Sequence, residues 1–228
     1  MVRFVFLDMD DTVMDFHASE RDALSRALRE YDIDPTDATL ARYSEINRAQ
    51  WRRLERGELT HGEVMSERFR LLLAELGREA DPAEMSELYE GYLAQTAYLM
   101  PHAAEVLPLL SAKYEVYAVS NGTVSVQLGR MERTGIGGYF RDRFFSQQVG
   151  YSKPRSEFFD ICFGRIPGFS AEDSVIVGDS LSSDILGGIN AGIRTVWLCP
   201  GERENGSGIV PDRVISSLAE LPGLLETM

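Results

Sequence analysis

The sequence is poor in cysteine and histidine, and it has no long hydrophobic run. The two cysteines match no metal-ligand or redox spacing, so we expect buried thiols at Cys162 and Cys199. The three histidines are too scattered along the chain to predict a metal cluster. No run approaches the ~18 apolar residues of a membrane span, and no apolar leader precedes the first expected strand. We therefore expect a cytoplasmic protein with no membrane partner.

Positive charge is also in short supply. The chain has 23 lysines and arginines against 36 aspartates and glutamates, which gives a formal net charge of −13. Such a surface repels the phosphate backbone and argues against a nucleic-acid polymer as partner. A small anion can still bind locally, because the remaining acidity is screened over about 10 Å. The 228 residues and 44% hydrophobic content suffice for one core domain with a modest insertion.

Carboxylates follow directly on the first apolar run. Residues 4–7 are apolar, and Asp8, Asp10, Asp11 and Thr12 come next. Alternate side chains of an extended chain share a side, so Asp8 and Asp10 can face one site at the carboxyl edge of a sheet. Carboxylates this close repel one another unless a cation is present, and a divalent metal is the natural one. The alternative is a simple turn, since Asp and Thr are common turn residues.

Polar side chains follow three later apolar runs in a fixed order. They are Ser120 with Asn121, then Lys153 before a proline, and finally Asp179 with Asp184. Taken singly, each would be a helix cap or a solvated charge. Taken together, ordered through one domain, they indicate a single site assembled at the ends of neighbouring strands.

With these residues in view, the chain resembles the haloacid dehalogenase superfamily of phosphotransferases. Its four ordered motifs match residues 8–12, Ser120, Lys153, and Asp179 with Asp184. The resemblance covers nearly the whole chain. It implies a Rossmann-like α/β core with a helical cap of the C1 type, inserted between the first and second motifs, that closes over the active site and selects the substrate.

The periodicity of the chain agrees with this division. Residues from about 17 to 98 have helical spacing and no convincing strand. Helices are expected near 18–31, 37–56, 61–77 and 83–97, and strands near 3–8, 115–119, 143–146, 174–178 and 194–198. We therefore predict a doubly wound parallel sheet in residues 1–16 and 100–228, and a helical cap domain in residues 17–99.

The residue types suit phosphate monoester hydrolysis. Asp8 would attack phosphorus and form an aspartyl-phosphate, which splits one difficult displacement into two. Asp10 would protonate the leaving alkoxide and then deprotonate the water that hydrolyses the intermediate. Ser120, with the backbone N–H groups of Met9 and Asn121, would hold the transferring oxygens.

A hard octahedral Mg²⁺ suits the same residues. The Asp8 carboxylate, the Asp10 backbone carbonyl and Asp179 would bind it. Asp184 is expected to act through a metal-bound water or through Lys153. Lys153 would offset the negative charge of Asp8 and of the phosphate, and it would help to hold the phosphate.

The expected cap offers two candidate substrate contacts. Asn47 and Trp51 share a helix face and could hydrogen-bond to and stack on a flat base; the alternative is that Trp51 packs in the cap's own small core. Residues 47–51 (NRAQW) and 57–60 (GELT) are similar to the cap of the bacterial pyrimidine nucleotidases of the superfamily. That similarity implies hydrolysis of pyrimidine nucleoside 5′-monophosphates, including noncanonical ones. Asp11 departs from the pattern, because relatives often carry glycine there.

The predicted function is thus a Mg²⁺-dependent phosphatase, with a pyrimidine 5′-nucleotidase as the expected type. Other small phosphate esters, such as sugar phosphates or phosphoglycolate, are the main alternative substrates. A dehalogenase needs no proton donor for a halide, so Asp10 favours phosphoryl chemistry. A phosphomutase or a catalytically silent binding protein of the same fold is a further alternative. The chain is expected to be a monomer, with a dimer through the cap as the other option.

Overall fold

The chain divides into two compact units. The computed structural model describes residues 1–201 and 205–228. The α/β unit comprises Met1–Asp15, Tyr98–Val124 and Thr134–Met228, and the helical unit comprises Phe16–Ala97 and Ser125–Arg133. Residues 125–133 therefore group with the helices, whereas the sequence pattern assigns them to the α/β domain.

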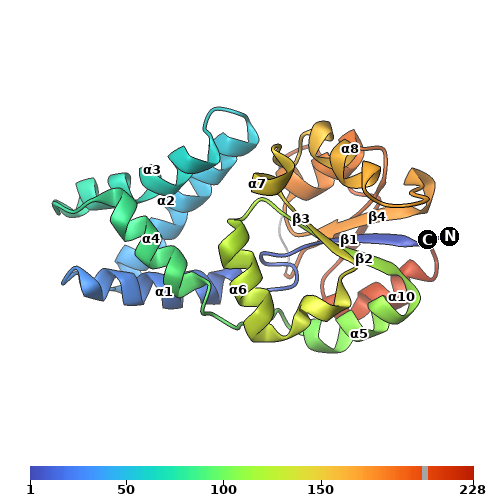
Figure 1. The fold of residues 1–228 in the computed structure, drawn as a ribbon, viewed down its shortest axis with the longest axis horizontal. Helices are drawn as coiled ribbons and strands as arrows, with labels where there is room; N and C mark the ends of the chain where they lie inside the picture. The colour runs from blue at the N-terminus through green and yellow to red at the C-terminus, as the bar shows by residue number, and fades with distance from the viewer. Residues whose placement is uncertain (202–204) are drawn as a thin grey trace. The chain divides into compact units, whose positions relative to one another are not determined.

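A six-stranded sheet forms the centre of the α/β unit (Figure 1). All its pairings are parallel, and the strand order is β3-β2-β1-β4-β5-β6. The strands are β1 (Phe4–Asp8), β2 (Glu115–Ser120), β3 (Asp142–Phe145), β4 (Ser174–Gly178), β5 (Arg194–Leu198) and β6 (Arg213–Ile215). This confirms the predicted doubly wound sheet. The sequence pattern does not predict β6, because three residues are too few to show a period.

Helices cover both faces of this sheet. In Figure 1, α8 lies on one face, while α5 and α10 lie on the other. The helical segments that follow the insertion are α5 (Ala103–Lys113), α6 (Val124–Thr134), η1 (Ile136–Tyr139), α7 (Ser146–Val149), α8 (Ser156–Gly164), η2 (Ala171–Asp173), η3 (Leu181–Ile185), α9 (Leu186–Asn190), η4 (Leu218–Glu220) and α10 (Leu221–Leu225). Among the described residues, no helix combines the length and apolar character needed to cross a membrane.

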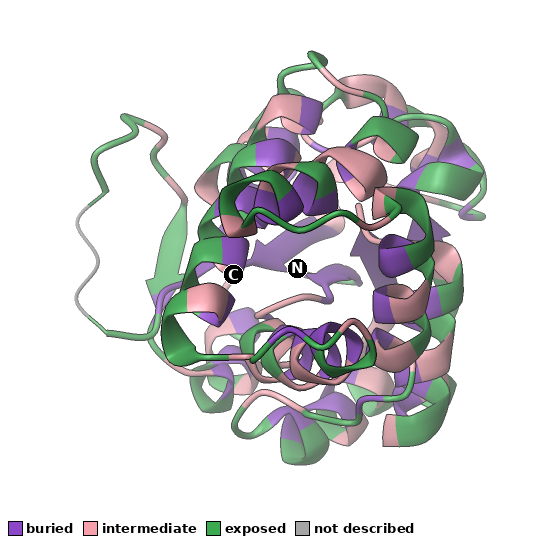
Figure 2. Cartoon of the chain, turned by 90° about the vertical axis from the view of Figure 1, so that its left-hand side faces the viewer, coloured by how far each residue is buried: buried purple, intermediate pink, exposed green. Residues whose placement is uncertain are grey.

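Aromatic side chains fill one side of the sheet. Phe4 and Phe6 alternate along β1 and pack in one cluster with Phe158, Phe159 and Cys162 of α8. The central strands β1, β2, β4 and β5 are accordingly buried almost throughout, as Figure 2 shows by colour, whereas β6 at the edge of the sheet is mostly exposed. Burial on both faces explains why the strands of the sheet centre are continuous apolar runs rather than alternating ones.

The strand order brings two chain segments to one edge of the sheet. β1 lies between β2 and β4, and Leu7 pairs with Val177. Asp8 ends β1 and Asp179 follows β4 directly, so both lie at the carboxyl ends of adjacent strands. The chain runs from β1 outward to β2 and β3 on one side and then crosses to β4 on the other side of β1. The strand order therefore reverses between β1 and β4, and such a switch point is where open α/β sheets bind ligands.

Local signals set the helices of the other unit, which are α1 (Phe16–Glu30), α2 (Asp37–Glu55), α3 (His61–Leu76) and α4 (Pro82–Leu93). Thr36 caps α2, and its hydroxyl accepts from the Thr39 N–H. Thr60 and Glu63 form a capping box at the start of α3, and Gly77 ends that helix with a φ of 61°. Each such cap contributes about 1 kcal/mol to helix stability.

The helical unit has its own apolar core. Its members come from α1 to α4 and include Leu24, Tyr43, Phe69 and Tyr89. Val126 of α6 belongs to the same cluster. α6 is thus packed as a fifth helix of this unit although its sequence lies between β2 and β3.

Candidate active site

Lys153 links two buried carboxylates. Its Nζ lies 2.6 Å from Asp8 Oδ1 and 2.6 Å from Asp184 Oδ1, and all three side chains are buried. Lys153 also donates to the Val119 carbonyl at 3.3 Å. The ammonium is therefore held at the end of β1 with all of its donors directed at oxygen atoms.

The electrostatics of this group depend on its burial. Burial and, after it, the charge of Asp184 raise the pKa of Asp8 from its ordinary value of 3.8 to about 8, although the charge of Lys153 lowers it. Burial disfavours the charged form of Lys153, but the charges of Asp184 and Asp8 outweigh it and raise the pKa of the lysine. Lys153 thus stays charged, and Asp8 needs further positive charge to ionise fully at neutral pH.

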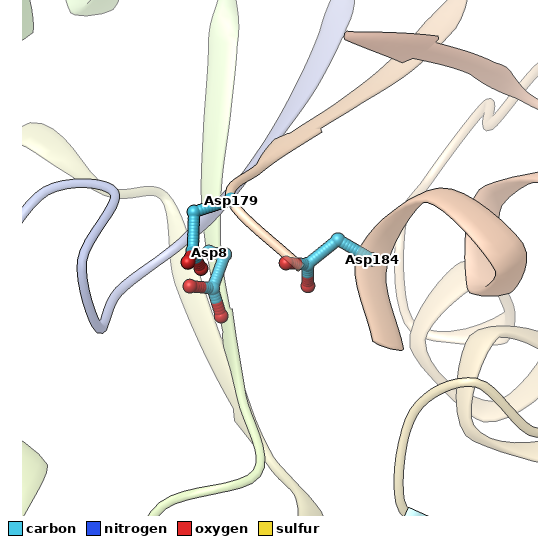
Figure 3. Close-up of side chains that lie close together, drawn as sticks. All are labelled: Asp8, Asp179 and Asp184. Atoms are coloured by element: carbon cyan, nitrogen blue, oxygen red, sulfur yellow. The ribbon is translucent and has the colours of Figure 1, made fainter. Parts of the chain in front are cut away.

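Three carboxylates converge at this point. Asp8, Asp179 and Asp184 each present an oxygen atom, and these atoms all lie within 4.8 Å of one another. Figure 3 shows the three carboxylates turned toward a common space from β1, from the end of β4 and from η3. Lys153 supplies one positive charge beside three acidic side chains. An oxygen-rich site with excess negative charge fits a hard divalent cation such as Mg²⁺.

Two neighbours position the residues that follow β4. Trp197 Nε1 donates to the Asp179 carbonyl at 2.8 Å, which ties this segment to β5. The Asp184 carboxylate occupies the space that a side chain at Gly178 would fill. Sequence reasoning missed both residues. For Gly178, the available signal is its position in a strand directly before Asp179, because a glycine in a strand often marks a place where another part of the chain approaches the backbone closely.

Asp184 is oriented by the start of its own helical turn. Its Oδ2 accepts from the Ser180 backbone N–H at 3.1 Å, while Oδ1 accepts from Lys153. The Ser180 hydroxyl in turn caps η3 by accepting from the Ser183 N–H at 3.2 Å. The carboxylate is therefore held from both sides, and it holds Lys153 in place.

Asn121 connects two of the predicted motifs. Its Nδ2 donates to the Lys153 carbonyl at 2.9 Å, and its Oδ1 accepts from the Lys153 N–H at the same distance. Ser146 Oγ donates to the Asn121 carbonyl at 3.1 Å. The side chain of Asn121 thus fixes the backbone that carries Lys153, a contact that the sequence does not reveal.

Ser120 ends β2 next to this contact. Its side chain is buried, and its Oγ accepts from the Gly122 N–H at 3.0 Å. The hydroxyl therefore shapes the turn that leads from β2 toward α6. It lies one residue from the Asn121 and Lys153 contact.

The turn after β1 places Met9, Asp10 and Asp11. The Met9 carbonyl accepts from Val13 at 3.0 Å and from Met14 at 2.8 Å, and Asp10 is half-buried beside this turn. Asp11 has a φ of 57°, in the left-handed region. That conformation accounts for the glycine expected there in relatives, because Asp tolerates it better than most residues but glycine does so best.

The two candidate cap residues lie in different settings. Asn47 is buried in the helical unit, where its Nδ2 donates to Glu20 at 2.8 Å and its Oδ1 accepts from Arg68 at 3.5 Å. Trp51 is partly exposed, and its ring meets His61 edge-on with centroids 5.6 Å apart. Trp51 is therefore the more accessible of the two to a ligand.

Comparison with known proteins places this chain in a family. Residues 2–192 match the model of the haloacid dehalogenase-like hydrolases, and the chain belongs to that family. It is 38% identical to the HAD-hydrolase YfnB of Bacillus subtilis, over 98% of this chain and 95% of that protein. A crystal structure of YfnB bound to magnesium, described as revealing interdomain movement, has a TM-score of 0.93 and covers 98% of both chains.

Two further relatives carry a named activity. The chain is 34% identical to the pyrimidine 5′-nucleotidase PynA of Streptococcus pneumoniae, over 98% of this chain and 95% of that protein. It is 31% identical to the pyrimidine 5′-nucleotidase YjjG of Escherichia coli, over 97% of each. The class of protein that the fold and the site define is therefore a hydrolase of the haloacid dehalogenase type with phosphatase relatives.

Proposed function

We propose that this chain is a Mg²⁺-dependent phosphatase that hydrolyses pyrimidine nucleoside 5′-monophosphates through an aspartyl-phosphate. The observation that carries the proposal is the contact of Lys153 with Asp8 and Asp184 beside the Asp179 carboxylate. It combines a buried carboxylate, a fixed ammonium and an oxygen-rich cation site at the switch point of the sheet. The relationship to PynA and YjjG supports the choice of substrate class.

In the first step, a carboxylate oxygen of Asp8 attacks phosphorus and the bond from phosphorus to the ester oxygen breaks. Asp10 gives its proton to the departing alkoxide. Lys153 lowers the repulsion between Asp8 and the phosphate dianion, since its ammonium lies 2.6 Å from the attacking group. Ser120 Oγ and the backbone N–H groups of Met9 and Asn121 hold the phosphoryl oxygens, as preorganised donors do in other acyl and phosphoryl transfers.

In the second step, Asp10 takes a proton from water, whose oxygen attacks phosphorus and releases Asp8 and inorganic phosphate. The Asp8 and Asp179 carboxylates and the Asp10 carbonyl would hold Mg²⁺, and Asp184 would position Lys153. When bound, Mg²⁺ neutralises charge on the phosphoryl oxygens. Binding of Mg²⁺ by the YfnB crystal structure supports this assignment.

The helical unit is proposed to select the nucleoside. Trp51 offers a partly exposed ring on α2 for stacking on the base, and stacking of this kind is worth about 1–3 kcal/mol. The movement between domains described for YfnB is proposed for this chain too.

The test is phosphate release from nucleoside monophosphates and sugar phosphates, with Mg²⁺ and with chelator. We expect metal-dependent preference for UMP, dUMP or dTMP, and a Trp51→Ala variant that raises KM roughly 10-fold with little change in kcat. Leu109→Ala, which removes an exposed side chain from α5, is the control and keeps wild-type values. A preference for sugar phosphates would overturn the substrate, and equal activity in chelator would overturn the metal.

A further inference from the structure

α6 belongs by its contacts to the helical unit, although it directly follows the loop that carries Ser120 and Asn121. Val126 packs into the core of that unit. At Gly129 a Cβ atom would lie 2.7 Å from the Ala94 carbonyl oxygen, so the helix backbone approaches the end of α4 as closely as glycine allows. Only a residue without a side chain fits there.

A buried guanidinium adds a second fixed point. Arg130 is 1% exposed, and its Nη2 donates to Ser19 Oγ of α1 at 3.1 Å. Its Cζ also lies 5.9 Å from the ring centroid of Phe16. Contacts to α1 and to the end of α4 therefore attach α6 to both ends of the insertion.

Asn121, just before α6, and Val124, the first residue of α6, are attached to the other unit. Asn121 is bonded to the backbone of Lys153, and the Val124 N–H donates to Gln147 Oε1 of α7 at 2.8 Å. The division between the units falls between Val124 and Ser125. Residues 122–124, which we term the α6 linker, therefore join a loop fixed on the sheet to a helix fixed on the helical unit.

We propose that α6 moves with the helical unit and that the α6 linker transmits its position to Ser120 and Asn121. Gly129 and Arg130 are then positioning residues for the phosphate-binding loop. Binding of the leaving group by the helical unit and binding of phosphate at Ser120 are then coupled, because the α6 linker connects the two binding sites. This inference rests on the phosphate-binding role proposed above for Ser120 and Asn121.

The mechanical part is tested with pairs of spin labels on exposed positions. Leu128 lies on α6, Glu87 on α4 and Asp160 on α8. Cys162 and Cys199 are buried, so the unsubstituted protein is the labelling control. Distances are measured in chelator, with Mg²⁺, and with Mg²⁺ plus inorganic phosphate.

We expect the distance from position 128 to position 87 to be narrow and unchanged in all three conditions. The distance from 128 to 160 should change or broaden together with the distance from 87 to 160. The proposal is overturned if 128 keeps its distance to 160 while 87 moves, or if all three distances stay fixed in every condition.

The coupling is tested by product inhibition. Gly129→Ala and Arg130→Met should raise the inhibition constant of inorganic phosphate several-fold, since the α6 linker is displaced. Arg130→Lys, which retains a donor toward Ser19, should restore most of the affinity, and Leu128→Ala should match wild type. Unchanged phosphate inhibition in both variants of an active enzyme overturns the coupling. A wild-type protein without phosphatase activity contradicts the proposed function instead, and the label distances still decide the mechanical part.

Discussion

The carboxylate of Asp184 lies where a Cβ atom on Gly178 would stand. Gly178 is the last residue of β4, and Asp184 comes from η3, so a bend of the chain returns the carboxylate against the strand that precedes it. The absence of a side chain at position 178 is therefore what lets Asp184 reach Lys153. Gly178 thus provides the space beside the backbone, and Asp184 fills it with a negative charge of the site.

Gly178→Ala should therefore displace Asp184 and reduce kcat by roughly 100-fold or more, with a loss of about 1–3 kcal/mol in the free energy of unfolding from overpacking. Phosphate release and denaturant unfolding measure the two effects. Gly164→Ala on α8 is the matched control, because a Cβ atom there meets nothing within 4 Å. Wild-type turnover in Gly178→Ala would contradict the role given to Asp184.

Lys153→Met should abolish most of the activity. The variant leaves Asp8 and Asp184 buried without their counter-ion, so the nucleophile is more often protonated and repels the phosphate more strongly when ionised. We expect kcat/KM to fall by roughly 10³-fold or more, comparable with the loss of other preorganised charge stabilisers. Lys113→Met tests specificity, since Lys113 pairs with Glu226 at the surface, and we expect it to retain full activity.

The pKa of Asp8 predicts how stability depends on pH in chelator. Burial and Asp184 raise this pKa to about 8, so the folded protein keeps a proton that the unfolded chain releases near pH 4. The contribution of Asp8 to the free energy of unfolding is therefore full below about pH 4 and is lost as the pH rises toward about 8. Thermal unfolding measured between about pH 4 and pH 8 should show stability falling as the pH rises, and this dependence on pH should be weaker in Asp8→Asn.

The same pKa predicts proton release on metal binding. Mg²⁺ binds the ionised carboxylate, so its affinity should rise with pH up to about 8 and then level. Calorimetry at neutral pH in two buffers of different ionisation enthalpy measures the protons released. An affinity that does not change between about pH 6 and pH 8 would argue against Asp8 as a ligand.

Asp11 is expected to shape the turn after β1 without taking part in chemistry. Its φ of 57° costs a residue with a Cβ atom about 1 kcal/mol. Asp11→Gly should thus keep turnover within a few-fold and leave stability unchanged or slightly higher. Asp11→Ala should keep turnover too but lose about 1 kcal/mol of stability, because alanine tolerates this conformation less well. A large loss of turnover in Asp11→Gly would assign Asp11 a chemical role.

The sequence predicts the sheet and the meeting of Asp8, Lys153 and Asp179, because apolar runs mark strands and parallel strands end at one edge. It does not predict that Asn121 holds the Lys153 backbone, since that contact depends on how two loops pack. The attachment of α6 to the helical unit is hidden for the same reason. Its helical pattern shows which face is apolar, but not which core receives that face.

The covalent state of Asp8 tests the central claim most directly. Wild-type protein is mixed with Mg²⁺ and UMP, quenched in acid during turnover, and digested for mass spectrometry of the peptide that contains Asp8. We predict a phosphoryl group on Asp8 that hydroxylamine removes, and neither phosphoryl group nor phosphate release in Asp8→Asn. Phosphate release without any modification of Asp8, or sustained turnover by Asp8→Asn, would contradict the account.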